Sequence, residues 1–365
     1  HRDLHSFPTR RSSDLLQRRH APESCQKRHG RVMATDVSNV ALRLAQAIAA
    51  GQRRALAQCC SLAESIRDDD QELLSAVLAE LPAPARHTRR VAVTGAPGVG
   101  KSSFVERWGT SLINAGHSVA VLAIDPSSRR TGGSILGDKT RMQVLANSSH
   151  AFVRPQPSGT HLGGTARATR LCIPLCEAAG YDTIIVETVG VGQSEVEVAD
   201  MVDLCLLLVL PTAGDDVQAI KRGIMEVADV VAVTKSDLDP EASRRAAAML
   251  SGAMRLLQPS SEEWTSRVVL ASAVDQDGLT EVDQSVADYF SDVRHDMVIR
   301  RRRRQQVQWY DDEVVAMMRQ ALLANSKVSQ TVGEMREAIV AGRLTVPHAS
   351  SAVVKVIQDV LKQGN

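Results

Sequence analysis

Aromatic side chains are scarce in this sequence, since Phe, Trp and Tyr together make up 3% of its 365 residues. Base-stacking platforms for single-stranded nucleic acid depend on such rings, so their scarcity argues against that kind of binding. Net charge is nearly absent as well, because 43 basic residues stand against 42 acidic ones and leave a formal charge of +1. No overall field attracts the chain to nucleic acid or to an anionic membrane, and we expect neither as a partner.

Long apolar runs and disulfide-like cysteine spacing are also missing. The longest apolar stretch, Leu204–Leu210, is far shorter than the roughly 18 residues of a membrane helix and suits a buried strand. The six cysteines show no framework spacing, and Cys205 lies inside that apolar stretch, as a small core residue would. A reducing compartment is the simple interpretation. We therefore expect a cytoplasmic protein, or one of the mitochondrial matrix if the source is eukaryotic.

The first 32 residues differ from the rest of the sequence. They begin with His1 rather than methionine, are rich in arginine and serine, and show no apolar periodicity before Met33. The segment resembles translated adapter sequence, so a non-native leader is one interpretation and a targeting peptide is the other. Residues 1–32 are left out of the fold prediction for that reason.

The hydrophobic pattern divides the remaining chain into three regions. Residues 33–85 are expected to form an N-terminal arm of two helices, with a break at Gly51. Residues 86–297 alternate β-rich runs with helical stretches, which predicts an α/β core whose mostly parallel sheet is flanked by helices. Residues 298–365 return to helical spacing. Strands are expected at Val91–Thr94, Ser118–Ile124, Ala151–Val153, Thr183–Val186, Leu204–Leu210, Val230–Thr234 and Val268–Leu270, and helices at Lys101–Ala115, Gly164–Ala179, Val217–Ala228 and Pro240–Leu257.

A complete phosphate-binding motif, G-x-x-x-x-G-K-[ST], follows the first expected strand and opens a helix. Its glycines let backbone N–H groups surround a phosphate, and the helix N-terminus adds partial positive charge. Lys101 is expected to bridge the β- and γ-phosphates, and the Ser102 hydroxyl to bind Mg²⁺. The candidate nucleotide-binding residues of this loop are Gly95, Ala96, Pro97, Gly98, Val99, Gly100, Lys101, Ser102 and Ser103.

Two carboxylates stand at the ends of apolar strands, where a P-loop protein needs a group near Mg²⁺. Asp125 follows one strand and Glu187 another. Mg²⁺ keeps several waters and takes few protein ligands, so either or both can act through water, and the division of roles stays open. Gly190 lies where a backbone N–H could approach the γ-phosphate. The candidate catalytic set is Lys101, Asp125, Glu187 and Gly190.

The segment Thr234-Lys235-Ser236-Asp237 indicates which nucleotide base the site prefers. It follows an expected strand, at the place where GTPases carry the N-K-x-D motif. A carboxylate at Asp237 would accept two hydrogen bonds from guanine, and adenine would leave it unpaired at a cost of about 1–3 kcal/mol. Ser272-Ala273 follows the next strand and is expected to read the guanine oxygen through a backbone N–H. Thr234 replaces the usual Asn and offers one hydroxyl instead of an amide, which leaves open whether guanine is held more loosely.

Four segments together resemble the methylmalonyl-CoA mutase-associated GTPases (MeaB/ArgK): Gly95–Ser103, Asp125–Ser128, Thr131–Met142 and Glu187–Glu195. The likeness extends from about Leu42 to the tail. It implies a P-loop GTPase that uses GTP/GDP and Mg²⁺, with Asp138 as a further metal ligand.

The resemblance also implies partners and moving parts. It predicts a homodimer, joined through residues 298–365, that regulates adenosylcobalamin loading and protection of a cobalamin-dependent acyl-CoA mutase. The family's third switch matches Pro211–Lys221, with three candidate relay residues: Asp215, Gln218 and Lys221.

The same residues are compatible with two other functions. An ATP-dependent kinase acting on a transport-system binding protein is the first alternative, and a metal-insertion GTPase is the second. Cys172 and Cys176 lie one helical turn apart without further metal-ligand spacing, so we expect them to be core or helix-surface residues. The five arginines of Arg300–Arg304 are expected to form a solvated helix face, with an acidic partner surface as the alternative.

Overall fold

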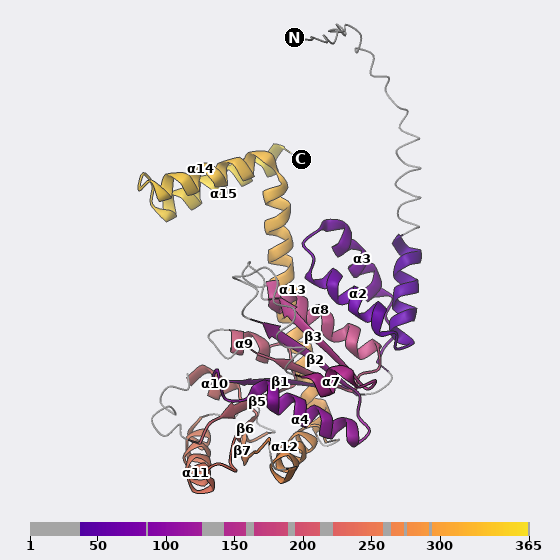
Figure 1. Ribbon diagram of the computed structural model, residues 1–365. Coiled ribbons are helices and arrows are strands. Elements are labelled where there is room, and N and C mark those ends of the chain that lie inside the picture. Colours follow the sequence, from indigo (N-terminus) through magenta and orange to yellow (C-terminus); the bar gives the residue numbers. More distant parts are fainter. Residues whose placement is uncertain are drawn as a thin grey trace, which may run out of the picture. The chain divides into compact units, whose positions relative to one another are not determined.

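The computed structural model (Figure 1) describes residues 37–84, 87–125, 142–157, 164–188, 194–211, 222–257, 264–273, 276–291 and 294–363. These residues form two compact units. One unit joins the described residues up to 84 with Leu171–Gly180, and the other contains the rest. The expected leader, residues 1–32, lies outside the described residues.

The first unit contains three helices before residue 80, where the sequence predicted two. Residues 37–49 are helical, and α2 (Arg53–Glu64) and α3 (Asp68–Ala79) follow. The second expected helix is divided by a connection that contains Ile66, an apolar residue with 88% of its surface exposed. Three aspartates in the first turn of α3 favour a helix start there, because the amino end of a helix attracts negative charge.

The second unit is built on a seven-stranded sheet with the order β3-β2-β4-β1-β5-β6-β7. All of its strand pairs are parallel, which confirms the predicted fold class. Each expected strand is present with its ends displaced by a few residues at most. The strands are β1 (Arg89–Gly95), β2 (Val119–Asp125), β3 (Ala151–Pro157), β4 (Thr183–Glu187), β5 (Leu204–Val209), β6 (Val230–Val233) and β7 (Arg267–Leu270).

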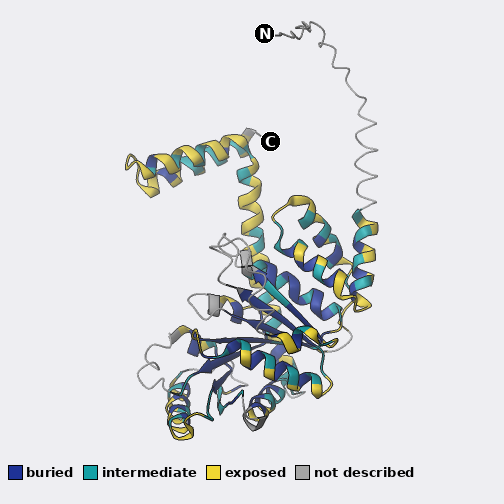
Figure 2. Cartoon of the chain, in the orientation of Figure 1, coloured by how far each residue is buried: buried dark blue, intermediate teal, exposed yellow. Residues whose placement is uncertain are grey.

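Helices cover the sheet, and the central strands are buried on both faces (Figure 2). Phe104 and Trp108 of the helix after the phosphate loop pack into the main apolar cluster together with strand residues such as Val93 and Leu206. The helices that follow β1 along the chain are α4 (Lys101–Asn114), α7 (Gln143–Asn147), α8 (Gly164–Ala178), α9 (Ser194–Ala199), α10 (Arg222–Val227), α11 (Pro240–Leu256), α12 (Gln276–Tyr289), α13 (His295–Ala324), α14 (Ser326–Val340) and α15 (Val346–Gln363).

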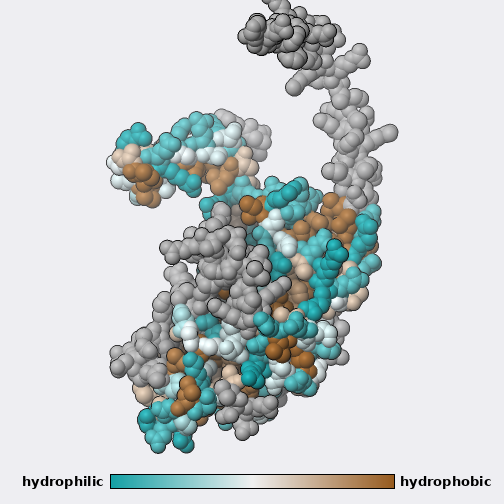
Figure 3. Space-filling model, in the orientation of Figure 1, coloured by the Kyte–Doolittle hydropathy of each residue, from teal (hydrophilic) through white to brown (hydrophobic). Residues whose placement is uncertain are grey.

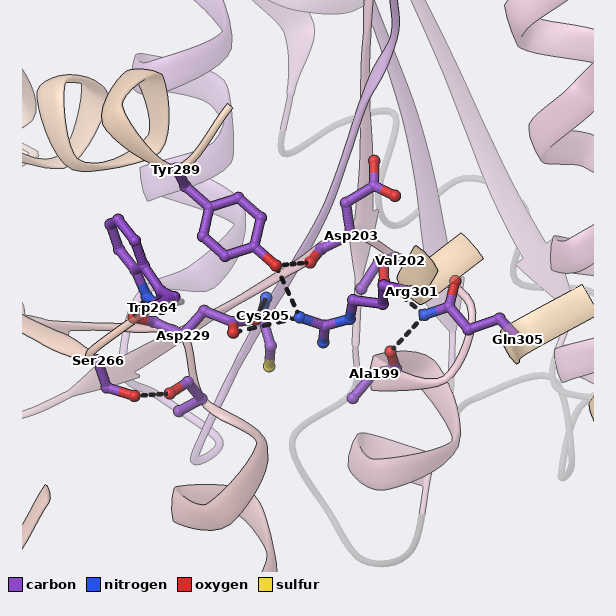
Figure 4. Close-up of polar contacts among 11 residues, drawn as sticks. Ala199, Val202, Asp203, Cys205, Asp229, Trp264, Ser266, Tyr289, Arg301 and Gln305 are labelled. Carbon is purple, nitrogen blue, oxygen red and sulfur yellow. Dashed lines mark hydrogen bonds and ion pairs between the residues drawn. The ribbon is translucent and has the colours of Figure 1, made fainter. Parts of the chain in front are cut away.

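The arginine run is not a solvated face at two of its five positions. Arg302 Nη2 lies 2.6 Å from Asp203 Oδ2. Arg301 Nη1 lies 3.0 Å from Asp229 Oδ2 (Figure 4). Arg301 also donates to Tyr289 Oη at 2.9 Å. Both carboxylates are buried, so two arginines of α13 neutralise charges that the core itself contains.

Burial and the ion pair act in opposite directions on the pKa of Asp229 and on the pKa of Arg301. Burial raises the pKa of the Asp229 carboxyl above its ordinary value, against the opposing charge of Arg301. Burial would lower the pKa of Arg301, but Asp229 and Tyr289 together, through their charges and hydrogen bonds, outweigh that effect and the pKa rises. The guanidinium therefore stays charged.

The tail region begins inside a continuous helix. The expected boundary between residues 297 and 298 falls within α13, whose first turns bury Met297 and Val298 in the main cluster. Further along, α14 and α15 pack against each other, and apolar side chains lie among polar ones on this hairpin (Figure 3). Exposed apolar residues there include Val340, Leu344, Val346, Val354 and Leu361. Among the helices that the structure describes, none is long and apolar enough to cross a membrane.

Candidate guanine-nucleotide site

The carboxyl ends of three neighbouring strands bring the predicted phosphate-side residues together. Glu187 of β4 pairs in register with Val93 of β1 and with Ala123 of β2. Two residues further along those strands lie Gly95 and Asp125. Because parallel strands end at the same edge of the sheet, the phosphate loop and both candidate carboxylate positions share that edge. For Asp125 the structure describes the strand position and not the side chain.

The phosphate loop has a backbone that its glycines make possible. Gly95 has a φ of 147°, and a Cβ atom there would lie 2.4 Å from the carbonyl oxygen of Leu208 on β5. Any other residue would therefore collide with backbone. Gly100 has a φ of 97° and immediately precedes Lys101, the first residue of α4. The loop thus ends at a helix N-terminus, whose N–H groups and partial charge suit a phosphate.

Lys101 lies inside the curve of this loop. Its Nζ donates to the carbonyl oxygens of Gly95 at 2.8 Å and Ala96 at 3.1 Å, and 8% of the residue is exposed. The ammonium group is therefore fixed by backbone at the start of α4. A buried, oriented positive charge beside a helix N-terminus is the arrangement that a polyphosphate requires.

Ser102 and Glu187 are in direct contact. Ser102 Oγ donates to Glu187 Oε1 at 2.7 Å, and Glu187 is buried. A hydroxyl and a carboxylate side by side supply the hard oxygen ligands that Mg²⁺ prefers, so this pair fits the expected metal. The neighbouring Thr188, to which the motif assigns no role, donates from its hydroxyl to Thr94 Oγ1 at 2.9 Å and from its N–H to Val93 O. These bonds fix the carboxyl end of β4 against β1.

The base-side residues also meet. Ser272 Oγ donates to Asp237 Oδ1 at 2.7 Å, so its hydroxyl orients the predicted base-reading carboxylate. Sequence reasoning gave Ser272 a backbone role only, because a motif does not show where a hydroxyl points. Ser236 binds the carbonyl oxygen of Ala271 through both its N–H and its hydroxyl. The segment 234–237 and the segment 271–273 are thereby joined.

Thr234 and Lys235 reach back toward the phosphate loop. The Thr234 hydroxyl lies 3.2 Å from Val99 O and 3.2 Å from Val209 O, and the residue is buried. Lys235 adopts a left-handed backbone with φ of 55°, and its Nζ lies 3.5 Å from Gly98 O. The two predicted halves of the site, phosphate loop and base segment, are therefore in contact.

Several predicted site residues lie outside the described residues. These are Asp138, Gly190 and the three relay residues Asp215, Gln218 and Lys221. Within the described ranges, no group of three or more His, Cys, Asp and Glu residues is placed to bind a metal ion. Cys172 and Cys176 are both buried, as expected for core residues.

The family model of the methylmalonyl Co-A mutase-associated GTPase MeaB matches residues 56–330 of this chain. The chain belongs to this family. A protein of Mycobacterium tuberculosis named "Probable GTPase" is 44% identical over 321 residues, covering 86% of this chain and 94% of its own length. GTPase ArgK of Escherichia coli is 48% identical, with 66% of this chain and 72% of its own covered.

The chain is also similar to an animal protein and to a protein of known structure. The mouse protein named "Methylmalonic aciduria type A homolog, mitochondrial" is 43% identical, covering 74% of this chain and 68% of its own. A crystal structure titled LAO/AO transport system kinase superposes with a TM-score of 0.67 at 33% identity, covering 88% of this chain and 98% of the other. This MeaB-family chain is therefore a GTPase, and it binds guanine nucleotide.

Proposed function

We propose that this GTPase is a chaperone that regulates adenosylcobalamin loading and protection of a cobalamin-dependent acyl-CoA mutase of the methylmalonyl-CoA mutase type. The observation that carries the proposal is membership of a family described as mutase-associated, over residues 56–330. The mouse relative, named for methylmalonic aciduria, supports the same partner.

The roles of the nucleotide-site residues belong to the proposal. Lys101, fixed by the loop carbonyls, neutralises the β- and γ-phosphates, and Ser102 with Glu187 binds Mg²⁺. Asp125, at the end of β2, would be a further ligand of the metal, directly or through water. Asp237, oriented by Ser272, accepts the guanine N–H groups. Mg²⁺ supplies charge neutralisation between the phosphates when bound. Catalysis then rests on positioning and charge, so intrinsic hydrolysis is slow.

The assembly proposed with this function is a homodimer formed through the tail. Its support is the set of exposed apolar side chains on α13–α15, among them Val315, Met317 and Met318. We place the protein in the cytoplasm, or in the mitochondrial matrix if its source is eukaryotic; the name of the mouse relative describes that protein as mitochondrial.

The test is GTP hydrolysis with and without purified methylmalonyl-CoA mutase, followed by transfer of adenosylcobalamin to the apo-mutase. We expect the mutase to raise the hydrolysis rate, and cofactor loading to depend on hydrolysable GTP. Ser102→Ala removes the proposed metal ligand and abolishes both effects, whereas Ser111→Ala changes an exposed serine of the same helix and retains them. A hydrolysis rate that is indifferent to mutase at saturating concentration contradicts the proposed partner.

A second candidate function is that of a kinase, because the solved relative is named a transport system kinase. A kinase of that kind would prefer ATP and transfer phosphate to protein. The Asp237 carboxylate, which Ser272 orients, favours guanine because adenine offers it no pair of donors. Competition of ATP against GTP at equal Mg²⁺ concentration decides between the GTPase and the kinase. Tighter binding of ATP than of GTP would favour the kinase.

A further inference from the structure

The two edge strands of the sheet, β3 and β7, differ in what they offer to a further strand (Figure 1). Edge strands present unpaired backbone groups, and proline is one of the residues that natural proteins place there to prevent pairing. β3 contains Pro155 and Pro157, which have no N–H to donate. β7 contains no proline and has the β-branched pair Val268-Val269 at its centre. Of the two edges, β7 is therefore the one that suits strand pairing.

The backbone of β7 alternates between groups that bind β6 and groups that point away from it. The N–H groups of Arg267 and Ala271 both donate to carbonyl oxygens on the β6 side. Because the direction of the backbone groups alternates along a strand, those of Val268 and Leu270 point to the opposite side. Among the strands that the structure describes, none pairs with that side of β7.

A cleft of about 380 Å³ lies between β7 and α12, and its lining residues are Arg267, Val268, Val269, Glu281, Gln284 and Ser285. Val269 packs against the main apolar cluster, to which α12 also contributes, so its side chain points to the face that α12 covers. The side chain of Val268 points to the opposite face, since consecutive side chains of a strand alternate. A cleft that both residues line therefore includes the edge of the sheet.

The charge that this cleft offers to a partner is negative. Its two charged lining residues are Arg267 and Glu281. Arg267 is already paired, because its Nη1 donates to Asp288 Oδ2 at 2.6 Å, and this bond lowers the pKa of the Asp288 carboxyl. Glu281 is exposed and forms no ion pair with the residues that the structure describes. Its carboxylate is therefore available to a basic side chain.

We propose that the outer edge of β7 is a docking site for an extended basic segment of a partner protein, which adds to the sheet as a further strand. The backbone of that segment pairs with the outward groups of Val268 and Leu270, and a lysine or arginine side chain reaches Glu281. In strand addition, main-chain hydrogen bonds supply affinity and alternate side chains supply preference. The inference depends neither on the proposed mutase partner nor on the roles proposed for the nucleotide-site residues.

The probe is an acetylated and amidated peptide in which lysine alternates with valine, and fluorescence anisotropy follows its binding to the full chain. Alternation places all of its lysines on one face of the extended peptide. We expect saturable binding of this peptide, and none of a counterpart with glutamate in place of lysine. A third peptide, N-methylated at every amide, cannot pair with a strand and is also expected not to bind. Bound lysine peptide should slow hydrogen exchange at the amides of Val268 and Leu270, which attachment to Glu281 alone would not do.

Two variants of the protein separate backbone pairing from charge. Val268→Pro removes an outward N–H and leaves the bonds to β6, so we expect the lysine peptide to bind about 2- to 10-fold more weakly. Glu281→Gln is expected to weaken binding about 2- to 5-fold and to reduce its dependence on salt. Glu72→Gln changes an exposed glutamate of α3 in the same way and should leave binding unchanged. Retained GTP binding shows that each variant is folded.

The outcomes that contradict the docking site are distinct. If Val268→Pro does not fold, the N-methylated peptide and the unaltered protein provide the same comparison. Absence of saturable binding at up to about 1 mM lysine peptide, or equal binding of the N-methylated peptide, overturns strand addition. Equal affinity for the glutamate peptide overturns the basic partner. Self-association of the protein that Val268→Pro abolishes would make a second copy of this chain the occupant, and would overturn the proposal as well.

Discussion

The ion pair between Arg302 and Asp203 provides a quantitative test of how α13 is joined to the core. Asp203 is 0% exposed, and Arg302 donates to it through Nε at 2.7 Å and through Nη2 at 2.6 Å. Replacing Arg302 by Met keeps the apolar stem and removes the charge, which leaves a buried carboxylate without its counter-ion. Breaking a buried pair in this way costs about 3–5 kcal/mol. Asp203 still accepts the N–H of Arg90 at 3.0 Å, so we expect the lower end, about 3 kcal/mol.

Urea unfolding followed by tryptophan fluorescence is the assay, because Trp108, Trp264 and Trp309 all lie in the second unit. Fluorescence therefore reports unfolding of the unit that contains the ion pair. A loss of about 3 kcal/mol corresponds to a fall in Tm of roughly 6–12 °C for a domain of this size.

Two further variants separate charge from packing. Arg304→Met changes an exposed member of the same run and is expected to alter stability by about 0.5 kcal/mol or less. Asp203→Asn combined with Arg302→Met removes the buried charge but keeps an acceptor for Arg90, and should recover part of the loss. The reasoning fails if Arg302→Met destabilises the protein no more than Arg304→Met does.

Three more predictions concern the nucleotide site and the first unit. Ser102→Ala should weaken Mg²⁺-dependent GTP binding by about 10-fold or more, and titration with and without EDTA would show whether the metal is involved. Ser272→Ala should lower the GTP-to-ITP affinity ratio a few-fold by freeing Asp237, whereas an unchanged ratio would show that the 2.7 Å contact does not orient it. Burial raises the pKa of Cys59 to about 11 from an ordinary value of 9.0, so the unfolded thiol ionises first. Stability should therefore fall as pH rises from about 9 to 11, and less steeply in Cys59→Ala, as pH-dependent urea unfolding followed by circular dichroism would show.

The sequence predicted the sheet and the phosphate loop well because both depend on local patterns. Continuous apolar runs such as Leu204–Leu210 identify buried parallel strands, and the spacing of Gly95 to Ser102 identifies the loop between strand and helix. Contacts between distant segments leave no such signal. The approach of the Thr234 hydroxyl to Val99, 135 positions earlier, depends on the order of strands in the sheet and on the backbone of Lys235.

The partners of the arginine run could not be predicted from the sequence either, for the same reason. Arg300–Arg304 resembles an exposed helix face in the sequence, because its partners Asp203 and Asp229 precede it by about a hundred and about seventy positions. Each aspartate stands alone immediately before an apolar strand, where a polar residue normally marks the strand's end. A carboxylate at that place and an arginine far downstream are both common, so only the fold shows that they form a pair.

The first turns of α13, which contain Arg301 and Arg302, and the nucleotide site lie at opposite ends of the same strands. Arg302 binds Asp203 and the carbonyl oxygen of Thr88, which directly precede β5 and β1, and Arg301 binds Asp229, which precedes β6. The carboxyl ends of β1 and β6 lead into the phosphate loop and the base-reading segment. Because these strands are buried and rigid, weakening α13 at their amino ends should lower stability while leaving GTP affinity of the folded protein unchanged. Attachment of the tail and recognition of the nucleotide are thus separable by mutation, although the same strands carry both.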